Sequence, residues 1–217
     1  SNADCGLIFR NTTVGNLEGN EAFGVVQVTR NIGSVHAEGI DYSVRYSFDL
    51  NQWGNLELAL DGTHVLDSSY VPAPGGATVD CVGRYGKQCG LPSTVSGSTG
   101  GPTPEDHFVQ RTTWSFGDFD ASLIWRYLSG SKVDATQAAD TDPVSASIPD
   151  YNYLDIAGSW QITDWAKLKF GVTNVTDEEA PFVATETGST PYNSGNTYPS
   201  TYDVLGRVFT FGVTTKF

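Results

Sequence analysis

The chain contains no methionine, only three histidines, and far fewer basic than acidic residues. Its 12 Lys and Arg stand against 25 Asp and Glu, for a formal net charge of −13. Nucleic-acid binding needs basic patches that neutralise phosphates, so this balance excludes DNA and RNA as partners. No apolar run reaches the roughly 18 residues of a transmembrane helix. A membrane-spanning strand needs only about 10 residues, of which every second one can be polar.

The first residues also lack the features of a natural N-terminus. Residues 1–3 have the sequence of a remnant of a cleaved expression tag, which leaves residues 4–217 as the protein itself. The sequence shows neither a signal peptide nor an initiating methionine. We therefore expect an upstream part of a longer precursor to precede residue 4.

Cysteine is scarce, and two of the three cysteines lie close together. Cys81 and Cys89 lie in a glycine-containing stretch, whereas Cys5 is close to the N-terminus. A small disulfide-closed loop is the favoured interpretation, and it implies an oxidising compartment. The alternative is a zinc site, which would need four nitrogen or sulfur ligands, and no second Cys or His cluster lies nearby. Cys5 is either a free thiol or the partner of an upstream cysteine.

Alternation of apolar and polar residues with a period of two dominates the chain. In the clearest segment, Ile40, Tyr42, Val44, Tyr46, Phe48 and Leu50 alternate with Asp41, Ser43, Arg45, Ser47 and Asp49. The pattern returns in residues 55–61, 108–116, 121–128, 153–161, 167–172 and 208–217, and shorter segments lie near 7–10 and 23–30. Because this is the periodicity of a strand, the sequence predicts an all-β fold of about nine strands.

The connections between these segments alternate strictly between short and long. Short turns lie at 51–54, 117–118 and 162–165, and long loops rich in Gly, Pro, Ser and Thr lie at about 68–104, 130–149 and 175–203. Trp53, Phe116, Phe119 and Trp165 lie beside the short turns, as expected of rings at a membrane interface. The pattern predicts an antiparallel up-and-down meander that forms part of a transmembrane β-barrel in contact with outer-membrane lipid. A soluble barrel or sandwich is the alternative.

Residues typical of catalysis or metal binding are not grouped in the sequence. His36, His64 and His107 lack a second ligand at metal-like spacing, and Asp140 and Asp142 lack the third carboxylate of a calcium loop. No Ser-His-Asp or Cys-His arrangement can be assembled. We therefore expect no enzyme activity, no catalytic residue, no cofactor and no metal.

Several segments resemble the late barrel strands of TonB-dependent receptors. They are Gly39-Ile40-Asp41-Tyr42, Asp61-Gly62-Thr63, Ile148-Pro149-Asp150-Tyr151, the segment from Leu168 to Asp177, and the end from Asn196 to Phe217. The resemblance implies a receptor of the Gram-negative outer membrane that imports a scarce nutrient, such as an iron–siderophore or a carbohydrate. It also implies a plug domain and a TonB-binding segment upstream, and a small-molecule ligand. A surface-binding or adhesin barrel that transports nothing is the alternative.

Particular residues are candidates for specific roles. Phe209, Phe211, Val213, Thr215 and Phe217 are similar to the terminal signal read by the outer-membrane assembly machinery. Tyr192, Tyr198 and Tyr202 are candidate substrate contacts in the last long loop. Inward-facing polar residues are expected to line the lumen or face the plug: Asp41, Arg45, Glu57, Asp61, Arg111, Asp155 and Lys169. Nine strands leave sheet edges open, so the chain is also expected to self-associate.

Overall fold

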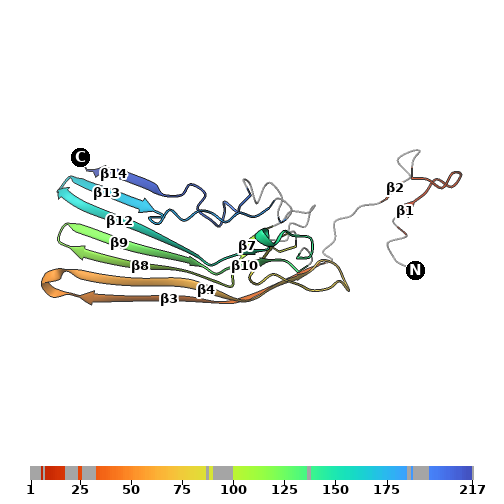
Figure 1. Ribbon diagram of the computed structural model, residues 1–217, viewed down its shortest axis with the longest axis horizontal. Helices are drawn as coiled ribbons and strands as arrows, with labels where there is room; N and C mark the ends of the chain where they lie inside the picture. The colour runs from red at the N-terminus through yellow and green to blue at the C-terminus, as the bar shows by residue number, and fades with distance from the viewer. Residues whose placement is uncertain are drawn as a thin grey trace.

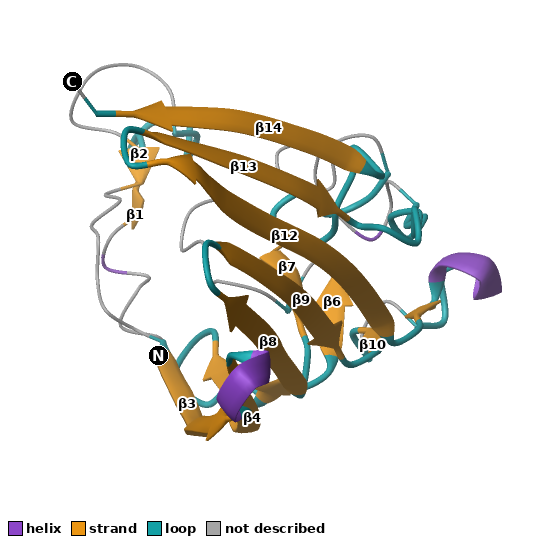
Figure 2. Cartoon of the chain, turned by 90° about the vertical axis from the view of Figure 1, so that its left-hand side faces the viewer, coloured by secondary structure: helices purple, strands orange, loops and turns teal. Residues whose placement is uncertain are grey.

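The computed structural model describes residues 6, 8–17, 24–25, 33–86, 88–89, 100–135, 138–184, 187 and 196–216. They fold mainly into antiparallel β-structure. One large sheet has the order β14-β13-β12-β9-β8-β4-β3 (Figures 1 and 2). Strand β5 (Val79–Asp80) pairs with β4. Its long strands are β3 (Ser34–Asp49), β4 (Asn55–Val71), β8 (Asp106–Phe116), β9 (Phe119–Leu128), β12 (Tyr151–Thr163), β13 (Ala166–Thr173) and β14 (Val208–Thr215). The predicted fold class is confirmed.

The short connections lie at one end of this sheet and the long ones at the other (Figure 1). The turn between β3 and β4 contains the 3-10 helix η2 (Asn51–Trp53). Gly54 ends this turn with φ +85°, where a Cβ would collide with the carbonyl oxygen of Ser115 on β8, the strand that neighbours β4 in the sheet. Glycine is therefore required, because this backbone conformation and this close approach both exclude a side chain.

The strand register sorts the side chains onto two chemically different faces. Pairs such as Arg45–Ala59, Glu57–Thr113 and Ser159–Lys169 put the polar positions of neighbouring strands on one side, here called the polar face. It holds all seven of the polar residues that the sequence predicted to face inward: Asp41, Arg45, Glu57, Asp61, Arg111, Asp155 and Lys169. The opposite side is the apolar face, and it remains exposed along its length: Val44 is 57% exposed, Trp160 50% and Phe211 78%.

The long connections contain short strands that the sequence did not predict. They are β6 (Arg84–Gly86), β7 (Gly100–Thr103), β10 (Ser131–Val133) and β11 (Ser147–Ile148), in a sheet of order β11-β10-β6-β7. The β10–β6 pair is parallel, unlike the pairs of the large sheet. These strands, with the 3-10 helix η3 (Pro143–Ser145) and the described residues of the loop between β13 and β14, form what we call the loop unit.

The buried apolar core lies mostly in the loop unit rather than against the large sheet. Its residues are Tyr85, Val133, Ile148, Tyr151, Tyr153, Val183, Tyr198 and Tyr202. Tyr151 and Tyr153 belong to β12, so the core joins the loop unit to the end of the sheet.

The N-terminal part contains β1 (Ile8–Phe9) and β2 (Gly24–Val25), which pair with each other. They lie in the two segments predicted as strands, but residues 26–30 fall outside the described part of the chain. Across the described ranges, no helix is long and apolar enough to cross a membrane.

Candidate functional site

The disulfide Cys81–Cys89 closes the first long loop, with 5.1 Å between the two Cα atoms. Both cysteines are buried, at 3% and 0% exposure. Gln88, next to Cys89, donates its backbone N–H to Asp134 Oδ2 at 3.1 Å, which links this loop to the next one. The disulfide interpretation thus agrees with the structure, whereas Cys5 lies outside the described residues.

Tyrosines form the centre of the loop unit. Tyr85 donates its hydroxyl to the carbonyl oxygen of Ser145 at 2.5 Å, and its ring packs edge-on against Tyr198 with 5.9 Å between centroids. Tyr198 donates to the carbonyl oxygen of Thr187 at 3.3 Å. Burial raises the pKa of Tyr198 to about 12 and also raises the pKa values of Tyr85 and Tyr202. Burial thus favours the neutral form of these phenols, and their packing stabilises the loops against one another.

These positions bear on the predicted substrate contacts. Tyr198 and Tyr202 are 0% and 2% exposed, so their rings hold the three long loops together. A direct contact with substrate stays a prediction for both, and one that their burial does not support. Tyr192 lies outside the described residues.

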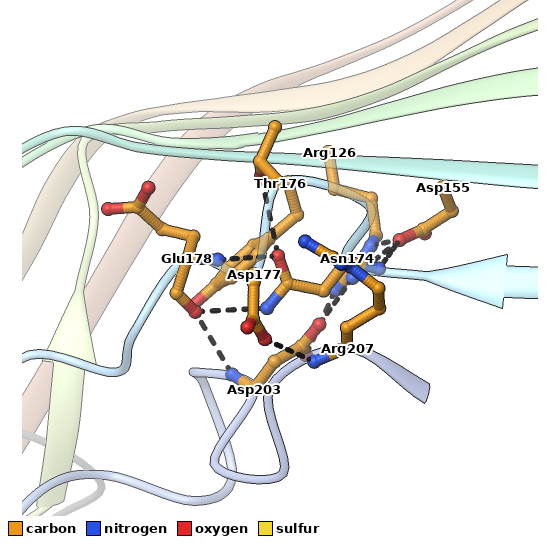
Figure 3. Close-up of polar contacts among 9 residues, drawn as sticks. Arg126, Asp155, Asn174, Thr176, Asp177, Glu178, Asp203 and Arg207 are labelled. Carbon is orange, nitrogen blue, oxygen red and sulfur yellow. Dashed lines mark hydrogen bonds and ion pairs between the residues drawn. The ribbon is translucent and has the colours of Figure 1, made fainter. Parts of the chain in front are cut away.

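Arg126 of β9 connects the wall of the sheet to the last long loop (Figure 3). Its guanidinium donates two hydrogen bonds to Asp155 of β12, at 2.8 and 3.1 Å, and two to Asp203 of the loop, at 3.2 and 2.5 Å. The same guanidinium lies 4.7 Å from the centroid of the Tyr153 ring. Two bidentate pairs fix both carboxylates in one orientation, which a lysine ammonium could not do.

Asn174 and Asp177 hold the two ends of that loop beside Arg126 (Figure 3). Asn174 is fully buried, has φ +54°, and forms reciprocal 2.9 Å hydrogen bonds with the backbone of Glu178. Asp177 Oδ1 accepts the backbone N–H of Arg207 at 2.8 Å, and Arg207 Nε donates to the carbonyl oxygen of Val175 at 2.8 Å. The segment from Leu168 to Asp177 that carries part of the family resemblance thus ends in the turn that anchors this loop.

A pocket of about 620 Å³ lies between the two limbs of the same loop. Its described lining includes the carboxylates Asp177, Glu179 and Asp203 and contains no lysine or arginine. Phe182 and Leu205 also line it and are 61% and 82% exposed. The pocket therefore combines acidic and apolar groups on the side of the molecule that carries the long loops.

The polar face itself is covered by hydrogen bonds between neighbouring strands. Asp61 accepts from Ser43 at 2.7 Å and from Arg45 at 3.0 Å, and Asp120 accepts from Ser115 and Ser159 at 2.8 Å each. These contacts bridge adjacent strands with polar groups that stay partly hydrated, as expected of a surface that lines a wet interior.

The predicted assembly residues lie on the edge strand β14. Phe209, Phe211 and Val213 are 62%, 78% and 67% exposed on the apolar face. Thr215 ends the strand, and Phe217 lies outside the described residues. Recognition of these residues by assembly machinery stays a prediction.

Comparison with known proteins gives a match at the level of structure. No protein-family model matches the sequence, and no curated protein matches it. A point variant of the ferric enterobactin receptor PfeA from Pseudomonas aeruginosa aligns with a TM-score of 0.50 and 13% identity, over 84% of this chain and 22% of the receptor. Another variant, in complex with enterobactin, aligns with a TM-score of 0.51 and 14% identity, over 84% of this chain and 23% of the receptor.

The chain thus spans less than a quarter of the length of these receptors. At such low identity the likeness establishes the fold, and it agrees with the strand register, the position of the long loops and the exposed apolar face. The described chain has the fold of part of the β-barrel of TonB-dependent siderophore receptors.

Proposed function

We propose that residues 4–217 are the C-terminal barrel portion of an outer-membrane TonB-dependent receptor that imports a scarce nutrient, with its plug and TonB-binding segment upstream. The substrate is an iron–siderophore, a carbohydrate or a similar small molecule. Support comes from the receptor-like fold and from the loop unit, which gathers the long loops at one end of the wall.

The exposed apolar face is the observation that carries this proposal. Leu123, Trp125, Ile156 and Trp160 project from adjacent strands β9 and β12 and are 46%, 39%, 41% and 50% exposed. Exposing such a continuous apolar surface to water is unfavourable, whereas lipid chains would cover it. The opposite face carries ion pairs and hydroxyls, so the two faces suit different surroundings.

The orientation of the wall can be tested with two neighbouring residues of β9. Leu123 faces the apolar side and Ser122 the polar side. In protein whose five tryptophans are replaced by phenylalanine, we expect lipids with brominated chains to quench L123W strongly and S122W weakly. Equal quenching of the two variants in lipid bilayers would contradict a membrane wall.

The transport step needs the full-length receptor. We expect deletion of its gene to abolish uptake of one labelled iron chelate or saccharide, and loss of functional TonB to have the same effect. Unchanged uptake of all candidate nutrients, together with reduced adhesion of the cells, would support the surface-binding barrel instead. Loss of uptake that does not depend on TonB would also contradict the proposal.

A further inference from the structure

We propose that His64, Glu105 and Asp106 form a binding site for a divalent transition-metal ion of the zinc class. The site lies where β4 meets the start of β8, at the end of the sheet that carries the long loops. It is separate from the pocket and from the Arg126 contacts, and it does not depend on the proposed transport function.

The three side chains meet although they are distant in sequence. His64 and Asp106 are register partners in the β4–β8 pair, and His64 Nδ1 lies 2.7 Å from Asp106 Oδ1. One ligand atom from each of His64, Glu105 and Asp106 lies within 4.8 Å of the others. Adjacent residues of a regular strand point to opposite faces. Glu105 and Asp106 reach the same side because Glu105 is in a bend just before β8.

Hydrogen bonds of the backbone hold this arrangement in place. Val65 donates its N–H to the carbonyl oxygen of Glu105 at 2.8 Å, which ties the bend to β4. Asp106 donates its N–H to Ser129 Oγ at 2.9 Å, and its carbonyl oxygen accepts the N–H of Ser129 at 2.8 Å. An ion would therefore meet ligands whose backbone is already fixed, which lowers the ordering cost of binding.

The charge of the cluster favours a cation. Within the part of the chain that the structure describes, no lysine or arginine forms an ion pair with Glu105 or Asp106. An imidazole and two carboxylates supply one nitrogen and two carboxylate oxygens, a ligand set that suits Zn²⁺ and its neighbours. Ca²⁺ requires six to eight oxygen ligands, so this set disfavours it. The side chains of His64 and Asp106 are 36% and 44% exposed, so an ion can reach them from outside.

The position of the site suggests what a bound ion does. His64 shares the apolar face with Phe108, Trp125 and Tyr127. The ring centroid of Phe108 lies 4.8 Å from that of Trp125 and 5.0 Å from that of Tyr127. An ion held there connects β4 to the segment that enters β8 from the loop unit. We therefore expect binding to stabilise the junction between the wall and the long loops.

The chain contains a matched control. His36 Nδ1 lies 3.5 Å from Asp67 Oδ2, and Glu38 is the register partner of Asp67. Among the described residues, however, only His64, Glu105 and Asp106 bring three ligand atoms within 4.8 Å of one another. If a His–Asp pair alone were enough to bind metal, H36A and H64A would weaken binding equally. If the three-residue site binds it, only H64A has a large effect.

The test is calorimetric titration of tag-free protein in detergent with ZnCl₂, and visible absorption with Co²⁺ as a spectroscopic probe. We expect one ion per chain. H64A and E105Q should each lower zinc affinity roughly tenfold or more. H36A and E178Q, which remove an imidazole and a carboxylate outside the site, should leave zinc affinity unchanged.

Glu105 is exposed, so E105Q tests the site even if H64A does not fold. We also expect zinc, but not the same concentration of Mg²⁺, to raise the melting temperature of wild type and not of E105Q. Absence of zinc binding by wild-type protein would overturn the proposal. So would binding that survives in E105Q, or a loss in H36A equal to that in H64A.

Discussion

At the scale of single residues, Arg126 joins the wall to the last long loop through its contacts with Asp155 and Asp203. Its side chain and that of Asp155 are 28% and 13% exposed, so its removal would leave two nearby carboxylates in a partly dry environment. We expect R126A to lower the free energy of unfolding of the last loop by about 2–3 kcal/mol, below the 3–5 kcal/mol of a fully buried pair. Hydrogen exchange of residues 196–207 in detergent measures this effect.

Arg45 provides the comparison for Arg126, because it forms an ion pair with Asp61 on the same polar face. That pair is 56% and 52% exposed, so R45A should change stability much less than R126A, because solvent screens exposed ion pairs. R126K should recover only part of the stability, because an ammonium group cannot replace two bidentate contacts. Equal protection of residues 196–207 in R126A and wild type would show that the loop is held by other contacts.

At the scale of the elements, the sequence was most informative about the wall. Strand β3 alternates through Tyr42, Val44 and Tyr46 because these residues share the apolar face, and this period is visible without a structure. The strands of the loop unit have two to four residues, too few to show a period. Their pairing depends on the disulfide and on tyrosines brought together from separate loops, which sequence spacing does not show.

The same limit applies to the candidate sites. Asp203 is 77 positions from Arg126, and Asp106 is 42 from His64. The strand register brings Asp106 to His64, whereas the fold of the last long loop brings Asp203 to Arg126. Asp155 was expected to face the polar side from its alternation alone, and it does. Tyr198 and Tyr202 look like exposed loop aromatics in the sequence, because nothing near them shows that three loops pack around them.

The loop unit should lose stability in alkaline solution. Unfolded tyrosines ionise near pH 10, whereas burial holds the pKa of Tyr198 at about 12 and raises the pKa values of Tyr85 and Tyr202. Below pH 10 both states keep their protons and stability is complete. Between pH 10 and 12 the unfolded state loses protons that the folded state retains, so the free energy of unfolding falls by up to about 1.4 kcal/mol per tyrosine per pH unit.

Denaturant unfolding in detergent, followed by near-ultraviolet circular dichroism at several pH values, measures this loss. Y198F should reduce the slope above pH 10, because it removes one of the three phenols that retain a proton. A free energy of unfolding that stays constant from pH 9 to 12 would mean that these tyrosines ionise without opening the loop unit.

At the scale of the whole molecule, two kinds of surface remain available for association. One is the apolar face, and the other is the pair of sheet edges, β3 and β14, each of which has one neighbouring strand within the described part of the chain. Edge strands present unpaired backbone N–H and C=O groups that favour pairing with another chain. In a complete barrel both surfaces would be covered, by lipid and by neighbouring strands respectively.

These two surfaces should respond differently to detergent. We expect the 217-residue chain to remain dimeric or larger in detergent, because detergent covers apolar side chains but does not satisfy the backbone groups of β3 and β14. Val44 and Phe211 are 57% and 78% exposed on the apolar face of these edge strands. V44K combined with F211K should therefore reduce association in water and leave association in detergent unchanged. Sedimentation velocity in density-matched detergent separates the two cases, and a monomer there would show that association proceeds through the apolar face alone.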